Sequence, residues 1–268
     1  MKILDPINEQ GHQEFNKEFA KNFKIESYVI LNNFNKNHFK SLINHFSLLK
    51  KADEGDVFLI FNNFSLFLLS FFFRNKGVRF VVHNNLDFAV NGKKMHYFFF
   101  KRIAKKYHLI YIEKRLKKIS HEYFNHLLCS DVILHPILNL KVNMNTTNNM
   151  NNVFVSGRNL TESQLKVICN RYALNRKVIC NKKFHSLTDV SNLNMGFISD
   201  FDATLQSCSR LYLIGNYKYR ASGILYKFLS MGDYKHIEIV FEDFSYYTEI
   251  KSSINSPNIK LIYMKNEC

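Results

Sequence analysis

The chain has 268 residues, 46% of them apolar, and a formal net charge of +15 at pH 7. This length allows one large or two small domains with an ample core, and the apolar content excludes an intrinsically disordered chain. The five cysteines are widely spaced and form no CxxC pair, which argues against a disulfide framework or a zinc site and indicates small buried residues in a reducing compartment.

The first half of the chain alternates short apolar strands with amphipathic helices. Residues 1–4 predict a strand, and a loop then leads into a helix with Phe15, Phe19 and Phe23 at four-residue spacing. Further strands are predicted over 28–31, 56–61, 78–82, 109–112 and 132–134, and helices over 39–49, 65–73 and 114–128, with a basic helix after the strand at 78–82. The apolar stretch 57–73 is interrupted by polar residues, so its parts are too short to span a bilayer. No signal-peptide pattern opens the chain.

A polar segment divides the chain. Residues 142–151 are mostly Asn and Thr without an apolar period and predict a linker between a domain over 1–141 and a domain over 152–268. In the second domain, strands are predicted over 153–155, 177–180, 196–198, 211–214, 237–241 and 259–263, and helices over 163–172, 203–208 and 222–231. This alternation predicts an α/β protein with two Rossmann-like, doubly wound domains that face a cleft.

The positive charge is concentrated in one segment. Between Lys93 and Lys118 the sequence has ten basic residues and a single acid, Glu113, with aromatic residues interleaved. Such a partly helical face suits an anionic membrane surface, although it would also suit nucleic acid or be a plain solvated helix face. The predicted membrane-surface residues are Lys101, Arg102, Lys105 and Lys106.

The segment 211–232 has the pattern of an anion site. An apolar strand leads through a Tyr-rich loop to Ser222 and Gly223 at the start of a helix, where free N–H groups and the helix dipole attract a phosphate. A plain helix cap without a ligand is the alternative interpretation. Arg220 and Arg158, the latter after a strand end and a glycine, are candidate phosphate ligands because guanidinium can bind phosphate with two hydrogen bonds. Tyr217 and Tyr219 can pack on a base or sugar, or cover a core edge.

His83 ends an apolar strand and is a candidate base or sugar ligand, with loop capping as the alternative. Asn84 follows it, and Gly11 and His12 are further candidates near the first strand. Asp200 and Asp202 have metal-ligand spacing but precede a helical pattern, so helix capping is predicted and no metal is expected. Walker, GxSxG, HExxH and GxGxxG motifs are absent from the sequence.

Five stretches, in order, resemble a GT-B glycosyltransferase, and in particular the bacterial family-4-like enzymes that build surface polysaccharides. The stretches are MKILDPINEQGHQEFNKEFAKNF at the start, GVRFVVHNN (77–85), CSDVILHPI (129–137), NNVFVSGRNL (151–160) and GFISDFDATLQSCSRLYLIGNYKYRASGILYKFLSMG (196–232). Many members of this family carry two glutamates eight residues apart in the last segment, and the matching positions here are Tyr219 and Lys227.

The resemblance implies transfer of a sugar from a nucleotide-diphosphate donor to a lipid-linked oligosaccharide or polysaccharide. The nucleotide-sugar is a substrate, and neither a cofactor nor a metal is expected. The enzyme would be cytoplasmic and peripheral on the inner face of the membrane, without a nucleic-acid partner. The implied catalytic residue is His83, the donor-binding residues are Arg158, Tyr217, Tyr219, Arg220, Ser222 and Gly223, and the acceptor-binding residues are Gly11, His12 and Asn84. A basic nucleic-acid-binding protein and a non-catalytic GT-B-like partner subunit are the alternatives.

Overall fold

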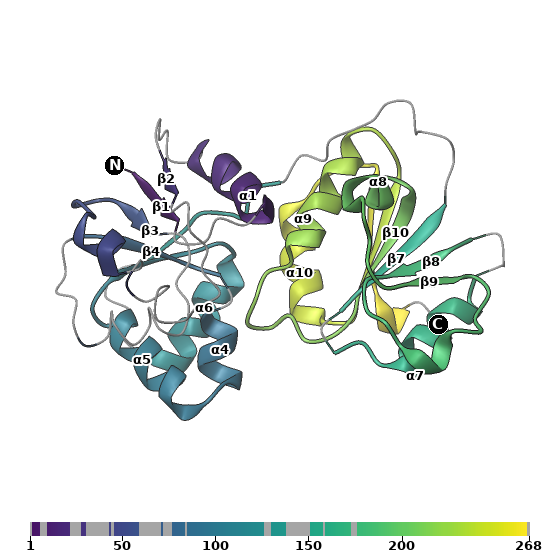
Figure 1. The fold of residues 1–268 in the computed structure, drawn as a ribbon, viewed down its shortest axis with the longest axis horizontal. Coiled ribbons are helices and arrows are strands. Elements are labelled where there is room, and N and C mark those ends of the chain that lie inside the picture. Colours follow the sequence, from purple (N-terminus) through teal and green to yellow (C-terminus); the bar gives the residue numbers. More distant parts are fainter. Residues whose placement is uncertain are drawn as a thin grey trace. The chain divides into compact units, whose positions relative to one another are not determined.

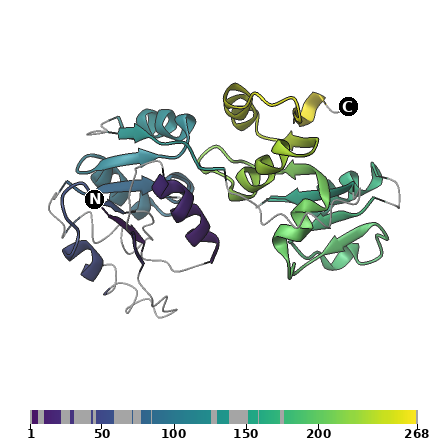
Figure 2. The same cartoon turned by 90° about the horizontal axis from the view of Figure 1, so that it is seen from above.

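The structure, a computed structural model, forms two compact units. It describes residues 2–5, 10–21, 28–30, 43, 46–58, 71, 77–83, 85–125, 130–137, 151–157, 159–172 and 176–266. The first unit comprises Met1–Pro136 with Tyr219–Ala221, and the second comprises Ile137–Lys218 with Ser222–Cys268. Residues 142–150 of the predicted linker lie outside the described residues. Each unit has its own sheet (Figures 1 and 2).

The first sheet is parallel and has the strand order β2-β1-β3-β4-β5-β6. Its strands are β1 (Ile3–Asp5), β2 (Tyr28–Ile30), β3 (Val57–Phe58), β4 (Arg79–Val82), β5 (His108–Tyr111) and β6 (Ser130–Val132). The helices of this unit include α1 (Gln10–Lys21), α4 (Asn85–Asn91), α5 (Lys94–Ala104) and α6 (Lys114–Phe124). Central strand residues such as Phe80, Val81 and Ile110 are completely buried, as expected for a parallel sheet that is covered on both faces.

The second sheet is also parallel, in the order β12-β11-β10-β7-β8-β9. Its strands are β7 (Asn152–Ser156), β8 (Val178–Cys180), β9 (Leu193–Met195), β10 (Cys208–Leu213), β11 (Ile237–Phe241) and β12 (Ile259–Tyr263). The helices are α7 (Glu162–Asn170), α8 (Phe201–Gln206), α9 (Gly223–Leu229) and α10 (Phe244–Ser253), with short 3₁₀ turns at His185–Leu187, Ser230–Asp233 and Met264–Asn266.

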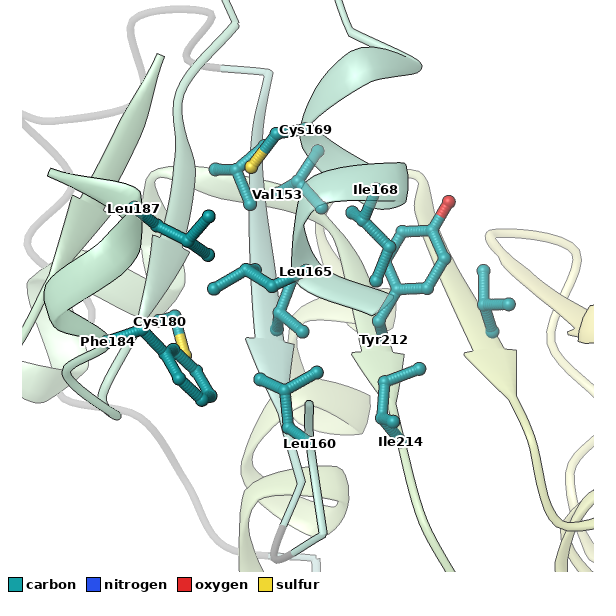
Figure 3. Packing of buried hydrophobic residues seen from close by; sticks show 13 residues of the cluster. Val153, Leu160, Leu165, Ile168, Cys169, Cys180, Phe184, Leu187, Tyr212 and Ile214 are labelled. Carbon is teal, nitrogen blue, oxygen red and sulfur yellow. The ribbon is translucent and has the colours of Figure 1, made fainter. Parts of the chain in front are cut away.

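Helices cover both faces of the second sheet. On one face, Leu165 and Ile168 of α7 project between the side chains of β7 and β10, including Val153 and Tyr212 (Figure 3). On the other face, the ring of Phe154 meets that of Phe201 on α8, with ring centroids 5.7 Å apart. Burial of each large apolar side chain contributes roughly 1.5–3 kcal/mol. The predicted fold class is therefore confirmed in its main feature: each unit is a Rossmann-like α/β unit.

The described cysteines behave as the sequence predicts. Cys169, Cys180 and Cys208 are buried and free. Burial raises the pKa of Cys169 to about 11 and that of Cys208 to about 12, because the thiolate loses its hydration. These thiols are thus core residues and not reactive groups at neutral pH.

Several details of the predicted elements are wrong. The last strand before α8 was expected over 196–198, but β9 is Leu193–Met195, because Gly196 has a φ of +110° and its amide donates to the carbonyl of Cys180. Helices α4 and α10 were not predicted. Among the described residues, no helix combines the length and the apolar character that crossing a membrane requires.

Candidate functional site

The order in which the chain adds strands to the second sheet reverses between β7 and β10. From β7 the chain proceeds outward to β8 and β9, and from β10 it proceeds outward on the other side to β11 and β12. Numbered along the chain, this is the strand order 3-2-1-4-5-6 of dinucleotide-binding sheets, whose ligands bind at the carboxyl ends of the strands where the order reverses. The loops that follow β7 and β10 are therefore the place in this unit where a ligand is expected.

These two loops are in direct contact. A Cβ atom placed on Gly157, just after β7, would lie 2.3 Å from the carbonyl oxygen of Ile214, just after β10. The next residue of the second loop, Gly215, has a φ of +107°, a conformation that residues with a side chain rarely adopt. Glycine at position 157 therefore allows the close approach of the two loops, and glycine at position 215 allows the backbone conformation of the second loop.

The loop after β10 is fixed at both ends by the segment that begins α10. The amide of Tyr217 donates to Oδ2 of Asp243 over 3.0 Å, and the amide of Ser222 donates to the hydroxyl of Tyr246, also over 3.0 Å. The rings of Tyr217 and Tyr246 lie 5.4 Å apart, and both side chains are buried. Tyr217 therefore helps to hold the loop, while its role in donor binding stays a prediction.

Ser222 and Gly223 lie at the start of α9, as the sequence predicts. The hydroxyl of Ser222 caps the helix by accepting a hydrogen bond from the amide of Leu225 at 3.5 Å. Since the amide of Ser222 is bound to Tyr246, a phosphate at this helix end would face Gly223 instead. Gly223 is exposed, and a Cβ atom placed on it would have no atom within 4 Å. The space beside it is thus open to a ligand.

The centre of the same loop belongs to the first unit. Tyr219 is buried there, with its hydroxyl 2.8 Å from that of Tyr123 on α6 and the two rings edge to face. Burial, helped by this hydrogen bond, raises the pKa of Tyr219 to about 12. The carbonyl of Arg220 accepts a hydrogen bond from Arg115 at 2.7 Å. The predicted donor roles of Tyr219 and Arg220 remain predictions.

Arg158 lies outside the described residues, as does Asn84. Gly11 and His12 were expected near a loop after the first strand, but both lie in the first turn of α1, which already begins at Gln10. Their role in acceptor binding stays a prediction.

His83 follows β4 directly and is half-buried, at the strand end where the sequence predicts it. The ring of Phe15 on α1 lies 4.5 Å from the ring of His83 and 5.0 Å from that of His135. His135 is buried, and its Nδ1 is 2.8 Å from the carbonyl of Pro136. Burial lowers the pKa of His135 to about 4, because the imidazolium form is poorly solvated. Two imidazoles thus flank Phe15 at the carboxyl edge of the first sheet.

A buried ion pair at this edge was not predicted. Glu113 and Arg115 stand at the start of α6, are both buried, and are joined by a hydrogen bond of 2.5 Å. The sequence placed Arg115 in a basic surface segment, and this was wrong. Charge pattern alone could not reveal the error, since it depends on how α6 packs.

The basic segment nevertheless has an exposed part on α5. Met95 and Phe98 are 58% and 48% exposed, and Arg102 lies over the rings of Phe98 and Phe71. Among the predicted membrane-surface cations, Arg102 and Lys105 are exposed and Lys101 and Lys106 are half-buried. We call Met95, Phe98, Lys101, Arg102, Lys105 and Lys106 the α5 patch.

The two aspartates with metal-ligand spacing have structural roles. Asp200 caps α8 by accepting from the amide of Ala203 at 2.9 Å, as predicted. Asp202 pairs with Lys227 at 2.9 Å. In the described part of the chain, no group of three or more His, Cys, Asp or Glu side chains is arranged to hold a metal ion.

Sequence reasoning did not single out Phe197 as a candidate residue. It lies just after β9, at the carboxyl edge of the second sheet, and its side chain is 97% exposed. The sequence placed it in a short predicted strand over 196–198. A fully exposed ring at this edge is available for stacking on a ligand or partner.

Neither a family model nor a curated protein matches the sequence. Among solved structures, the crystal structure of the glycosyltransferase SnogD from Streptomyces nogalater is similar, with 8% sequence identity and a TM-score of 0.43. The similarity covers 90% of this chain and 80% of that one. It is too distant to assign a family.

Proposed function

We propose that the chain is a glycosyltransferase that takes its sugar from a nucleotide-diphosphate donor. The observation that carries this proposal is the strand order of the second sheet, whose point of reversal lies between β7 and β10. That is where Rossmann-like sheets bind nucleotides. The ordered resemblance of the sequence to GT-B enzymes adds the transfer reaction to nucleotide binding, and the presence of two Rossmann-like units fits such an enzyme.

Sugar transfer requires that the charge on the departing diphosphate be stabilised and that the acceptor hydroxyl lose a proton. In the proposed enzyme, Arg158 and the helix start at Gly223 bind the diphosphate without a metal ion. His83, at the carboxyl end of β4, takes the proton from the acceptor. Arg158 and His83 are assigned because each follows a strand in the sequence, at the edge where open α/β sheets bind ligands. Gly223 is assigned because it lies at the start of α9 with open space beside it.

Titration calorimetry with UDP, GDP and CMP tests the donor site. The Arg158→Ala variant removes a charged hydrogen-bonding partner of the phosphate and should weaken binding about ten- to hundredfold. Arg176→Ala is the matched control, because Arg176 precedes β8 and so lies at the opposite, amino edge of the sheet, beside the ring of Tyr172. It should leave the affinity unchanged. If none of the nucleotides or their sugar derivatives binds, the proposal is wrong.

Transfer itself is tested with nucleotide-sugars and a lipid-linked oligosaccharide. His83→Gln should abolish turnover and leave nucleotide affinity intact, and EDTA should have no effect on the wild-type rate. Nucleotide binding without turnover on any acceptor would instead favour the non-catalytic partner subunit. Loss of activity in EDTA that manganese restores would contradict the metal-independent mechanism.

We further propose that the acceptor is reached at an anionic membrane surface through the α5 patch. Exposed Met95 and Phe98 supply apolar contact, and the surrounding cations each contribute about 1 kcal/mol near anionic lipid. Sedimentation with phosphatidylserine vesicles should show binding that Arg102→Glu with Lys105→Glu weakens. Lys251→Glu, an exposed lysine on α10, is the control. Binding to DNA or RNA but not to vesicles would support the nucleic-acid alternative.

A further inference from the structure

Glu242 occupies a special place at the carboxyl edge of the second sheet. It directly follows β11, the neighbour of β10, and its amide donates to the carbonyl of Leu213 over 3.2 Å. Its side chain is half-buried. A carboxylate in such a position is costly to desolvate unless hydrogen-bond donors surround it.

Both oxygens of this carboxylate are bound, and by two different loops. Oε1 accepts a hydrogen bond from Nε2 of Gln164 at 3.0 Å, and Oε2 accepts one from the amide of Gly215 at 2.5 Å. Gln164 lies in the first turn of α7, the helix that follows the loop after β7. Gly215 lies in the loop after β10. A single carboxylate therefore joins the two loops that meet at the reversal point of the sheet. We call these two hydrogen bonds of Glu242 the bridge.

The orientation of Gln164 is determined by its other contacts. Its Oε1 accepts from the amide of Thr161 at 3.0 Å, while the hydroxyl of Thr161 accepts from the amide of Gln164 at 3.3 Å. Because the side-chain oxygen of Gln164 is held by this capping box, its side-chain nitrogen Nε2 points at Glu242. The bridge is thus anchored to the start of α7 and does not depend on a freely rotating side chain.

Glu242 is poorly suited to bind a phosphate itself, because its negative charge would repel one. We propose that Glu242 is a positioning residue of the candidate nucleotide site, which sets the separation of the loops after β7 and β10. This inference rests on the proposed function for the identity of the ligand. Through its bonds to Gln164 and Gly215, Glu242 adds a side-chain link between the two loops to the backbone contact of Gly157 with Ile214.

The bridge makes a specific prediction about exchanging its donor and acceptor. In Glu242→Gln, the new amide group can accept from only one of the two donors and opposes the other with its own N–H groups. In the double variant Glu242→Gln with Gln164→Glu, the new carboxylate accepts from the new amide, and it can still accept from Thr161 in a capping box. The reversed pair should therefore restore the bridge that the single variant loses.

Hydrogen exchange of the Gly215 amide, followed by mass spectrometry, measures the bridge directly. We expect exchange about tenfold faster in Glu242→Gln, nucleotide affinity about tenfold weaker, and substantial recovery of both in the double variant. Glu238→Gln is the matched control. Glu238 is a half-buried carboxylate on β11, the strand that Glu242 follows, but its partners are Arg210 and Lys260, so neither quantity should change.

Unchanged exchange at Gly215 in Glu242→Gln would overturn the proposal, and so would a double variant no better than the single one. A wild-type protein that binds no nucleotide would refute the proposed function instead. In that case the exchange measurement still decides whether Glu242 fixes the two loops.

Discussion

Replacing Gly157 with alanine tests how closely the loops after β7 and β10 must approach. The added Cβ would lie 2.3 Å from the carbonyl oxygen of Ile214 and 2.9 Å from its Cβ. A carbon and an oxygen approach to about 3.3 Å, so the two strand ends must separate by about 1 Å. The nearest obstacle is a backbone atom, which no change of rotamer can move. Overpacking of this kind costs about 1–3 kcal/mol.

Differential scanning calorimetry of Gly157→Ala should show a lower midpoint for the second unit. For a unit of this size, roughly 4 °C is lost per kcal/mol, which gives a decrease of roughly 4–12 °C. The same displacement changes the spacing of the proposed nucleotide site, so the affinity for the nucleotide should also fall. Both measurements are made on the full chain.

Gly223→Ala is the control for stability, because a Cβ atom at Gly223 meets no atom within 4 Å. If Gly157→Ala melts within about 1 °C of the wild type while it binds nucleotide normally, the two loops tolerate separation. The close contact at Gly157 would then have no role in the site.

Three other substitutions or conditions give separate tests. Gly223→Ala should leave the fold as stable as before or stabilise it by about 0.5 kcal/mol. It should weaken nucleotide binding in calorimetry because the methyl group occupies the space a phosphate would approach, and an unchanged affinity would exclude Gly223 from the site. Asp200→Ala removes the side chain that accepts a hydrogen bond from the amide of Ala203, and it should lower the free energy of unfolding in urea by about 1 kcal/mol. If the wild type needed manganese for activity and the variant lost that activity, Asp200 would instead be a metal ligand. The pKa of His135 is lowered to about 4 in the folded protein, so the unfolded state binds the proton more tightly. The free energy of unfolding should therefore fall by up to about 3 kcal/mol as the pH decreases from about 6.5 to 4. His135→Asn should show a smaller fall over that range, and an equal fall would mean that other groups cause it.

Local sequence patterns predicted most of the regular structure. The apolar runs of β11 and β12 were placed with the bounds that the structure has, and the cap at Asp200 and the helix start at Ser222 were also found. These features depend on residues within a few positions of each other, which is the range over which periodicity and capping act. Helix α10 was missed because only Tyr246 and Ile250 of its residues are buried, so its apolar period is weak.

Charge and hydropathy patterns gave wrong predictions of burial where tertiary packing decides which side chains are exposed. Arg115 lies among basic neighbours in the sequence, yet it is buried against Glu113. Phe197 lies among apolar neighbours, yet it is almost fully exposed. Composition indicates which side chains prefer water on average, but burial at one position depends on what the rest of the chain places against it.

By itself, then, the sequence determined that apolar strands alternate with helices, because hydrophobic periodicity is a local property of the chain. Only the tertiary structure decided that β10 pairs with β7, and hence that Gly157 meets Ile214 and that Glu242 joins Gly215 to Gln164. These residues are separated by 27 to 78 positions, and no local pattern records which distant strands become neighbours. The order of the strands fixes which loops share an edge, and that order is set by packing of the whole sheet.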